Sequence, residues 1–564
     1  MQARRPQRRA PSSPPWDPNA VTPATRDEVY PFAAGGTVLG FFALLVCYSK
    51  GYLLLYGDAV AHLGIARRIV DSHYPGLAQL GGVWLPLPHL LMLPFIGHMT
   101  MWQTGFAGVP MSLLSYALSV AGIWRLGRRM MRPRWALVGT AFYALNPNLL
   151  YLATTAMTEA LFLALLIWSV VAAVETASAL RVGRVRSAAV GMIAAGVLIV
   201  AQVFTRYDGW VVGAAIWCWL AWELWRAGSE MQRRLRTPFV VFTLMCLAGP
   251  VVWFWYNQHF EGDWLDFMRG PYSAKAIERK TAPPGQHYRG WHNPAWALLF
   301  YTRTGQVNAA VWETGFVLMT GALYGLWIQW RRRAEAAVRE RAETGLWLLW
   351  VPLPFYVYSV AYGSVPIFIP QLWPHSYYNA RYGMEMLPAL ALYGALAAER
   401  LDLWLRARTA GWAKVGARLW QPAAMVLCAL NCIGMMYRIP SVLKEGIVNA
   451  STRVPFEHAL ASFLMQVPSG EPVMMATSAH VGAVQTAGRD LRSMVSEQDE
   501  VSWERALADP ARNAAYVIAI AGDSVEKAVA EHPEGMVELE VICTTGQPCA
   551  KVYQSRLWKP GTTR

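Results

Sequence analysis

Three carboxylates at the ends of apolar runs, away from the basic loops, are the residues best suited to chemistry. Asp58 follows the first long apolar run, Glu159 opens the fourth, and Asp208 lies between the fifth and the sixth. A carboxylate in such a place can take a proton from an acceptor hydroxyl. Ionisable side chains near a membrane interior are costly, which favours a functional role. The structural alternative is that each acid caps a helix or complements its N-terminal dipole.

Two arginines accompany these acids. Arg206 precedes Asp208 in FTRYDGW, and Arg381 lies near Tyr378 in HSYYNARYGMEMLP. A guanidinium group at either place could clamp a phosphate, with Asp208 and Tyr378 as further substrate contacts. Alternatively, Arg206 and Asp208 could form a local ion pair, and Arg381 could extend to lipid headgroups.

One histidine raises the question of a metal. His62 lies one helical turn after Asp58 in GDAVAH, a spacing that places both side chains on one helix face. The pair could hold a divalent metal, or His62 could contact substrate. A capped helix carrying an unrelated histidine is the alternative.

The elements that must position these residues are membrane helices. The chain is 55% hydrophobic and 15% charged, against about 45–50% and 25% in soluble domains, which excludes a disordered or fibrous protein. A bilayer core needs about 20 apolar residues per helix. The sequence predicts a polytopic α-helical membrane protein with about eleven spans, at 31–53, 107–127, 134–152, 157–176, 187–204, 209–225, 238–257, 307–330, 344–363, 382–399 and 419–438. The proline-rich stretch 85–101 is interpreted as interfacial or re-entrant.

The net charge of +14 is a topology signal. Arginines and lysines gather in the N-terminal tail and in alternate loops, which predicts that these parts are cytoplasmic. The three acids and the C-terminus are then external. No basic stripe with interleaved aromatic residues is left for nucleic acid, which is therefore excluded as a partner.

The chain divides into three expected parts: a disordered cytoplasmic tail (1–30), a membrane domain (31–439) and a small external α/β domain (440–564). Helices are predicted at 455–466, 478–487 and 523–531, and strands at 471–476, 514–521, 536–542 and 550–557. Cys543 and Cys549 could form a disulfide in an oxidising compartment, or stay free thiols. The C-terminal domain contains neither a phosphate-binding loop nor metal-ligand spacing, so a lid or docking surface is favoured.

Taken in order, GDAVAH, TEALF, TRYDGW and NARY resemble motifs of GT-C glycosyltransferases. The sequence is most similar to bacterial relatives of protein O-mannosyltransferases and lipid A aminoarabinose transferases, over residues 31–438. The resemblance implies transfer of a hexose, such as mannose, from a polyprenyl-phosphate donor. The acceptor would be a hydroxyl of a glycan, lipid or protein at the external face of a bacterial inner membrane.

The same resemblance implies roles for residues. Asp58 would be the catalytic base of an inverting displacement, Glu159 the second acid of the external cavity, and Arg206 and Arg381 the contacts of the donor phosphate. Asp58 is followed by Ala59 where many O-mannosyltransferases have a second acid. The DxD pair of oligosaccharyltransferases is absent around Glu159, so no cofactor is expected to be required, with a divalent metal as the alternative.

Two other functions compete with this one. A lipid flippase or transporter would usually show internal repeats and charges near the bilayer midplane, and the sequence shows neither. A different ligase or polymerase of lipid-linked glycans would use the same substrates and is harder to separate.

Overall fold

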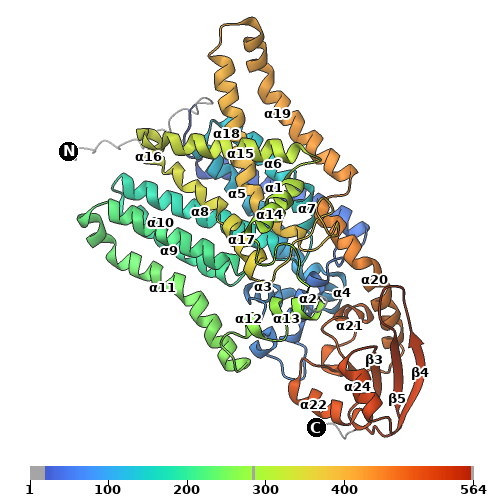
Figure 1. The fold of residues 1–564 in the computed structure, drawn as a ribbon. Coiled ribbons are helices and arrows are strands. Elements are labelled where there is room, and N and C mark those ends of the chain that lie inside the picture. Colours follow the sequence, from blue (N-terminus) through green and yellow to red (C-terminus); the bar gives the residue numbers. More distant parts are fainter. Residues whose placement is uncertain (1–19, 282–285, 561–564) are drawn as a thin grey trace, which may run out of the picture.

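The computed structural model describes residues 20–281 and 286–560 and consists mainly of helices (Figure 1). The longer helices are α1 (Arg26–Ser49), α5 (Val109–Met130), α8 (Glu159–Arg181), α9 (Val185–Val203), α10 (Asp208–Arg226), α11 (Ser229–Phe260), α14 (Pro294–Ala309), α15 (Thr314–Arg331), α17 (Pro352–Tyr362), α18 (Leu387–Arg406), α19 (Gly411–Tyr437) and α20 (Ser441–Leu464). Shorter helices connect them: α2 (Gly57–Arg68), α3 (Leu87–Ile96), α4 (Met99–Thr104), α6 (Pro133–Ala144), α7 (Pro147–Leu152), α12 (Asp266–Arg269), α13 (Ala274–Thr281) and α16 (Ala336–Arg341). Tight 3₁₀ turns include η4 (Glu343–Trp350) and η5 (Ala380–Met386).

Within the described residues, seven helical stretches are long and apolar enough to cross a membrane. The pair α14 and α15, bent by 106°, would make an eighth. Each of the eleven predicted ranges overlaps helical structure, and the number of spans stays a prediction. Helix α3 has 10 residues, about half the length that a bilayer core requires.

Several predicted boundaries differ from the structure. The range 134–152 is two helices, α6 and α7, because Pro147 starts a new helix and the Asn146 side chain caps it by accepting from two backbone N–H groups. Helix α15 begins at Thr314 rather than 307. Helix α1 begins at Arg26, so residues 26–30 are helical rather than part of a disordered tail; residues 1–19 lie outside the described part.

The C-terminal part is a small five-stranded sheet with helices. The strand order is β2-β1-β3-β5-β4. Strand β1 (Val473–Met475) pairs in parallel with β2 (Met494–Val495) and β3 (Tyr516–Ile520), and β5 (Ala550–Ser555) pairs antiparallel with β3 and with β4 (Met536–Ile542). The helices are α21 (Val481–Ala487), α22 (Glu500–Ala508), α23 (Pro510–Asn513) and α24 (Ser524–Glu531). A disulfide between Cys543 and Cys549 lies in the connection from β4 to β5.

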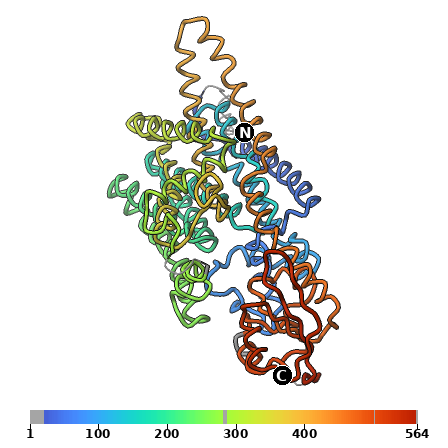
Figure 2. Tube along the Cα trace, turned by 45° about the vertical axis from the view of Figure 1, so that its right-hand side comes forward, coloured from blue at the N-terminus to red at the C-terminus, as the bar shows by residue number. Residues whose placement is uncertain are grey.

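Helix α20 joins the two parts of the chain (Figures 1 and 2). It begins at Ser441, well before the predicted start at 455. Pro455 lies inside the helix, and since proline is typical of a first helical turn, the sequence pattern suggested a start there. Because of this longer helix, the C-terminal segment reaches back into the helical part.

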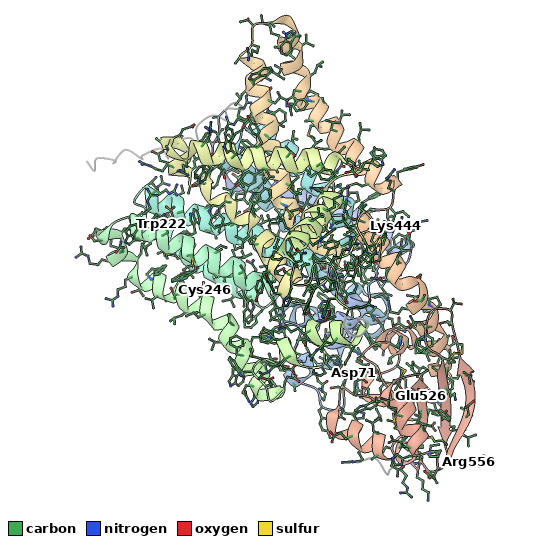
Figure 3. The ribbon with its side chains drawn as sticks, viewed as in Figure 1. Asp71, Trp222, Cys246, Lys444, Glu526 and Arg556 are labelled. Atoms are coloured by element: carbon green, nitrogen blue, oxygen red, sulfur yellow. A yellow bond between two sulfur atoms is a disulfide. The ribbon has the colours of Figure 1, made fainter. Side chains whose placement is uncertain are left out.

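The sheet part is also attached through α2. Asp71, labelled in Figure 3 near the junction of the two parts, is buried. Its carboxylate accepts hydrogen bonds from the Leu491 backbone at 3.1 Å, from Arg492 Nε at 3.0 Å and from Arg67 Nε at 2.9 Å. A buried carboxylate with several charge-assisted donors is a strong attachment. The C-terminal part is therefore packed on the helix that begins with Gly57 and Asp58.

Candidate functional site

Five predicted site residues meet in one cluster of ion pairs: Asp58, Glu159, Arg206, Asp208 and Arg381. Helix N-termini bring three segments together: Asp58 lies at the start of α2, Glu159 at the start of α8 and Asp208 at the start of α10. Arg381 lies in η5 and forms ion pairs with Asp58 and, from Nε to Oε1 at 3.0 Å, with Glu159. It also lies 3.6 Å from Glu445 Oε1, which α20 contributes.

Arg206 organises the second half of the cluster. Its Nη1 lies 3.2 Å from Glu159 Oε1 and its Nε lies 3.1 Å from Asp208 Oδ2. Its Nη2 donates to the Tyr356 hydroxyl at 2.8 Å, and that hydroxyl also lies 2.9 Å from Asp208 and 2.8 Å from Glu385. Glu159 thus connects the two arginines through one carboxylate oxygen.

An aromatic ring supports both guanidinium groups. The ring centre of Tyr382 lies 4.8 Å from the Arg206 guanidinium carbon and 4.9 Å from that of Arg381. Such contacts favour a cation near the ring face. The ion pairs and the ring together hold the two arginines in one arrangement.

A cavity of about 190 Å³ opens beside Arg381. It is lined by Tyr56, Gly57, Asp58, Tyr378, Asn379, Arg381, Glu445, Asn449 and Arg453. The Asp58 side chain is 42% exposed, whereas those of Arg381 and Glu445 are 7% and 1% exposed. Glu159 is fully buried behind Arg381 and does not line the cavity. Asp58 is therefore the carboxylate that a molecule in this cavity meets.

The His62 side chain contacts another histidine and a tryptophan. Its Nδ1 lies 2.9 Å from Nε2 of His89, and its ring packs on Trp84 with 4.2 Å between ring centres. Burial, with help from the positive charges of Arg381 and Arg206, lowers the pKa of His62 to about 3, so the imidazole is neutral at physiological pH. Across residues 20–281 and 286–560, no three potential metal ligands of the His, Cys, Asp or Glu type come together.

Sequence reasoning missed Tyr356, Tyr382, Glu385 and Glu445. Tyr382 directly follows Arg381 in NARYGME, and Glu385 lies four residues after it. The closeness of these polar residues to Arg381 in the sequence was a signal that could have identified them. Tyr356 is inside an apolar run and gives no such signal. Glu445 lies beyond the last predicted span, where it was assigned to the separate C-terminal domain.

The apolar helices and the C-terminal sheet domain define a polytopic α-helical membrane protein with a small α/β domain. The fold matches the crystal structure of ArnT from Cupriavidus metallidurans bound to undecaprenyl phosphate, with a TM-score of 0.57 and 14% identity over 95% of this chain and 100% of that one. The apo structure of the same ArnT matches with a TM-score of 0.54 and 14% identity over 94% of this chain and 99% of that one. No protein-family profile matches the sequence, and neither does any curated protein. The predicted fold, a polytopic helical protein with a small C-terminal α/β domain, is confirmed, and the likeness to ArnT is a likeness of fold.

Proposed function

We propose that this chain is a membrane glycosyltransferase that moves a sugar from a polyprenyl-phosphate donor to an acceptor hydroxyl. The main support for this proposal is the polar cavity in which Asp58, a partly exposed carboxylate, is paired with the buried guanidinium of Arg381. A carboxylate that faces a cavity can accept a proton from an acceptor hydroxyl, as a general base does. The fold shared with an ArnT structure bound to undecaprenyl phosphate supports a lipid-linked donor.

The reaction needs one displacement. The acceptor hydroxyl gives its proton to Asp58 while its oxygen forms a bond to the anomeric carbon of the sugar. The bond from that carbon to the phosphate oxygen breaks, and its electron pair leaves with the polyprenyl phosphate. A single displacement inverts the configuration of the anomeric carbon. Arg381 provides positive charge next to the base and the departing phosphate.

The other site residues have supporting roles in this proposal. Glu159 and Asp208 hold the two arginines in place, since both acids are buried and paired with guanidinium groups. Tyr378 lines the cavity next to Arg381 and provides a sugar or acceptor contact. The alternation of basic loops supports a cavity on the external side, which in a bacterial inner membrane is the periplasm.

The experiment compares envelope lipids, glycans and proteins by mass spectrometry in cells that carry the intact protein or Asp58→Asn. The variant should lose one sugar-bearing product and accumulate the polyprenyl-phosphate sugar. Asp263→Asn is the matched control, because it also removes a carboxylate paired with an arginine, Arg269, but one in the loop between α11 and α12 rather than in the cavity. An unchanged envelope profile with Asp58→Asn would refute the catalytic role.

A second readout separates a transferase from a lipid flippase. A transferase releases one polyprenyl phosphate for every sugar that it transfers, whereas a flippase moves the lipid-linked sugar without breaking a bond. Release of polyprenyl phosphate by membranes with the intact protein, and its loss with Asp58→Asn, is therefore expected. Equal release from both membranes would count against the proposal.

A further inference from the structure

One face of α20 forms a wall of the cavity. Glu445, Asn449 and Arg453 follow one another at intervals of four, a spacing that places side chains on the same helix face. All three line the cavity that also contains Asp58 and Arg381. A segment outside the predicted membrane domain thus contributes a third of the cavity's lining residues.

The guanidinium of Arg381 is already engaged with carboxylates. Its Nη2 faces Asp58, its Nε faces Glu159 and its Nη1 faces Glu445. A phosphate that approached Arg381 would have to compete with these anions for the same N–H groups. Arg381 therefore supplies charge next to Asp58, but few free hydrogen-bond donors.

Arg453 differs from Arg381 in this respect. Its Nη2 donates to the backbone oxygens of Leu54 at 3.0 Å and Leu55 at 3.2 Å, and its Nη1 pairs with Glu457. Its Nε is buried and has no hydrogen-bond partner in the described part of the chain. A buried guanidinium N–H without an acceptor is costly. This unsatisfied N–H group belongs to a side chain that lines the cavity.

The start of α2 lies next to this donor. A Cβ atom built at Gly57 would lie 3.8 Å from Arg453 Nε, and the residue that precedes α2, Tyr56, provides no side-chain cap. The first N–H groups of a helix favour a negatively charged group. Asn449, which is exposed on the same wall, adds an amide that can donate.

We propose that Arg453, assisted by Asn449 and the N-terminus of α2, binds the phosphate of the lipid-linked donor. This inference rests on the proposed function and extends it, because it assigns the phosphate contact to α20 and leaves Arg381 to hold Asp58. The C-terminal segment is then part of the substrate-binding site, and the sheet domain that follows α20 is continuous with it.

The test measures the affinity of the purified full chain for undecaprenyl phosphate and for undecaprenol, the same lipid without the phosphate. Arg453→Gln should weaken binding of undecaprenyl phosphate by about tenfold or more, as expected for a hydrogen bond to a charged group, and leave undecaprenol binding unchanged. Asn449→Ala, at an exposed position, should weaken the phosphate lipid by about two- to tenfold.

Arg489→Gln is the matched control. Arg489 also donates to backbone oxygens, those of Val467, Pro468 and Glu471, and it does not line the cavity. This variant should bind both lipids as the intact chain does.

Each outcome has one meaning. If Arg453→Gln weakens both lipids equally, Arg453 has a structural role and the inference is wrong. If both Arg453→Gln and Asn449→Ala bind as the intact chain does, the inference is wrong while the proposed function stands on Asp58→Asn. If the intact chain does not prefer undecaprenyl phosphate to undecaprenol, the proposed donor class is wrong, and this inference is wrong with it.

Discussion

Replacing Arg381 by methionine tests the central ion-pair network. The substitution keeps an unbranched side chain of similar length but removes the charge that three carboxylates share. Glu159 and Glu445 are each 1% exposed, so water cannot replace the lost guanidinium at either of them. Asp58 is 42% exposed and can turn to solvent.

The expected loss of stability depends on which carboxylates stay buried without a partner after the substitution. Breaking a buried ion pair by removing one member costs about 3–5 kcal/mol, because it leaves an uncompensated charge in a medium of low polarity. Glu159 still contacts Arg206 at 3.2 Å, which offsets part of its cost, whereas Glu445 has no second ion pair among the described residues. We therefore expect Arg381→Met to lower the free energy of unfolding by roughly 3 kcal/mol.

The assay is equilibrium unfolding of the detergent-solubilised chain, followed by tryptophan fluorescence. Arg233→Met is the control, since it removes an arginine from an ion pair whose two side chains are 79% and 57% exposed, and it should leave stability unchanged. Adding Glu445→Gln to Arg381→Met should recover part of the loss, because the stranded charge is then absent. A loss no larger than that of the control, or a double variant less stable than the single one, would refute the reasoning.

Two other perturbations test the attachment of the sheet domain and the state of the histidine pair. Asp71→Ala removes the acceptor of Leu491, Arg492 and Arg67, so the C-terminal part should be released faster by limited trypsin digestion; an unchanged rate would show that this attachment is unimportant. The pKa of His62 is about 3 in the folded chain against an ordinary 6.5, so between these values the unfolded chain binds more protons and stability falls as pH falls, by up to about 1.4 kcal/mol per pH unit. His62→Gln should flatten this decline in pH-dependent unfolding, and an equal slope in both chains would contradict the assignment of a neutral histidine.

The helical architecture could be predicted because a long apolar run in a chain with so few charged residues favours a membrane helix over other structures. Breaks inside a run were harder to predict. Pro147 follows Asn146 within an apolar stretch, and the pair ends one helix and caps the next. Hydropathy averaged over a window does not detect such a pair. The range 134–152 was therefore predicted as one helix, whereas the structure has α6 and α7.

The site could be predicted in part because acids are rare near the apolar runs. Asp58, Glu159 and Asp208 each open a helix, and the alternation of basic loops placed these helix starts on one side. Which arginine meets which acid depends on packing between helices far apart in the sequence. Arg206 and Asp208 form the local pair that their spacing suggests, yet Arg206 also reaches Glu159, a contact that no local pattern indicates.

Helix α20 explains the largest omission. Glu445, Asn449 and Arg453 form a polar stripe at helical spacing, a pattern that the sequence contains. The stripe follows the last apolar run, and a boundary at residue 440 assigned it to a separate domain. Since α20 is continuous from Ser441 to Leu464, its first turns line the cavity while its last turns pack with the sheet domain through Phe463 and Tyr516. Arg453 and Glu445 therefore lie on the same helix that packs with the sheet domain. The first turns of α20 thus form part of the wall of the candidate site.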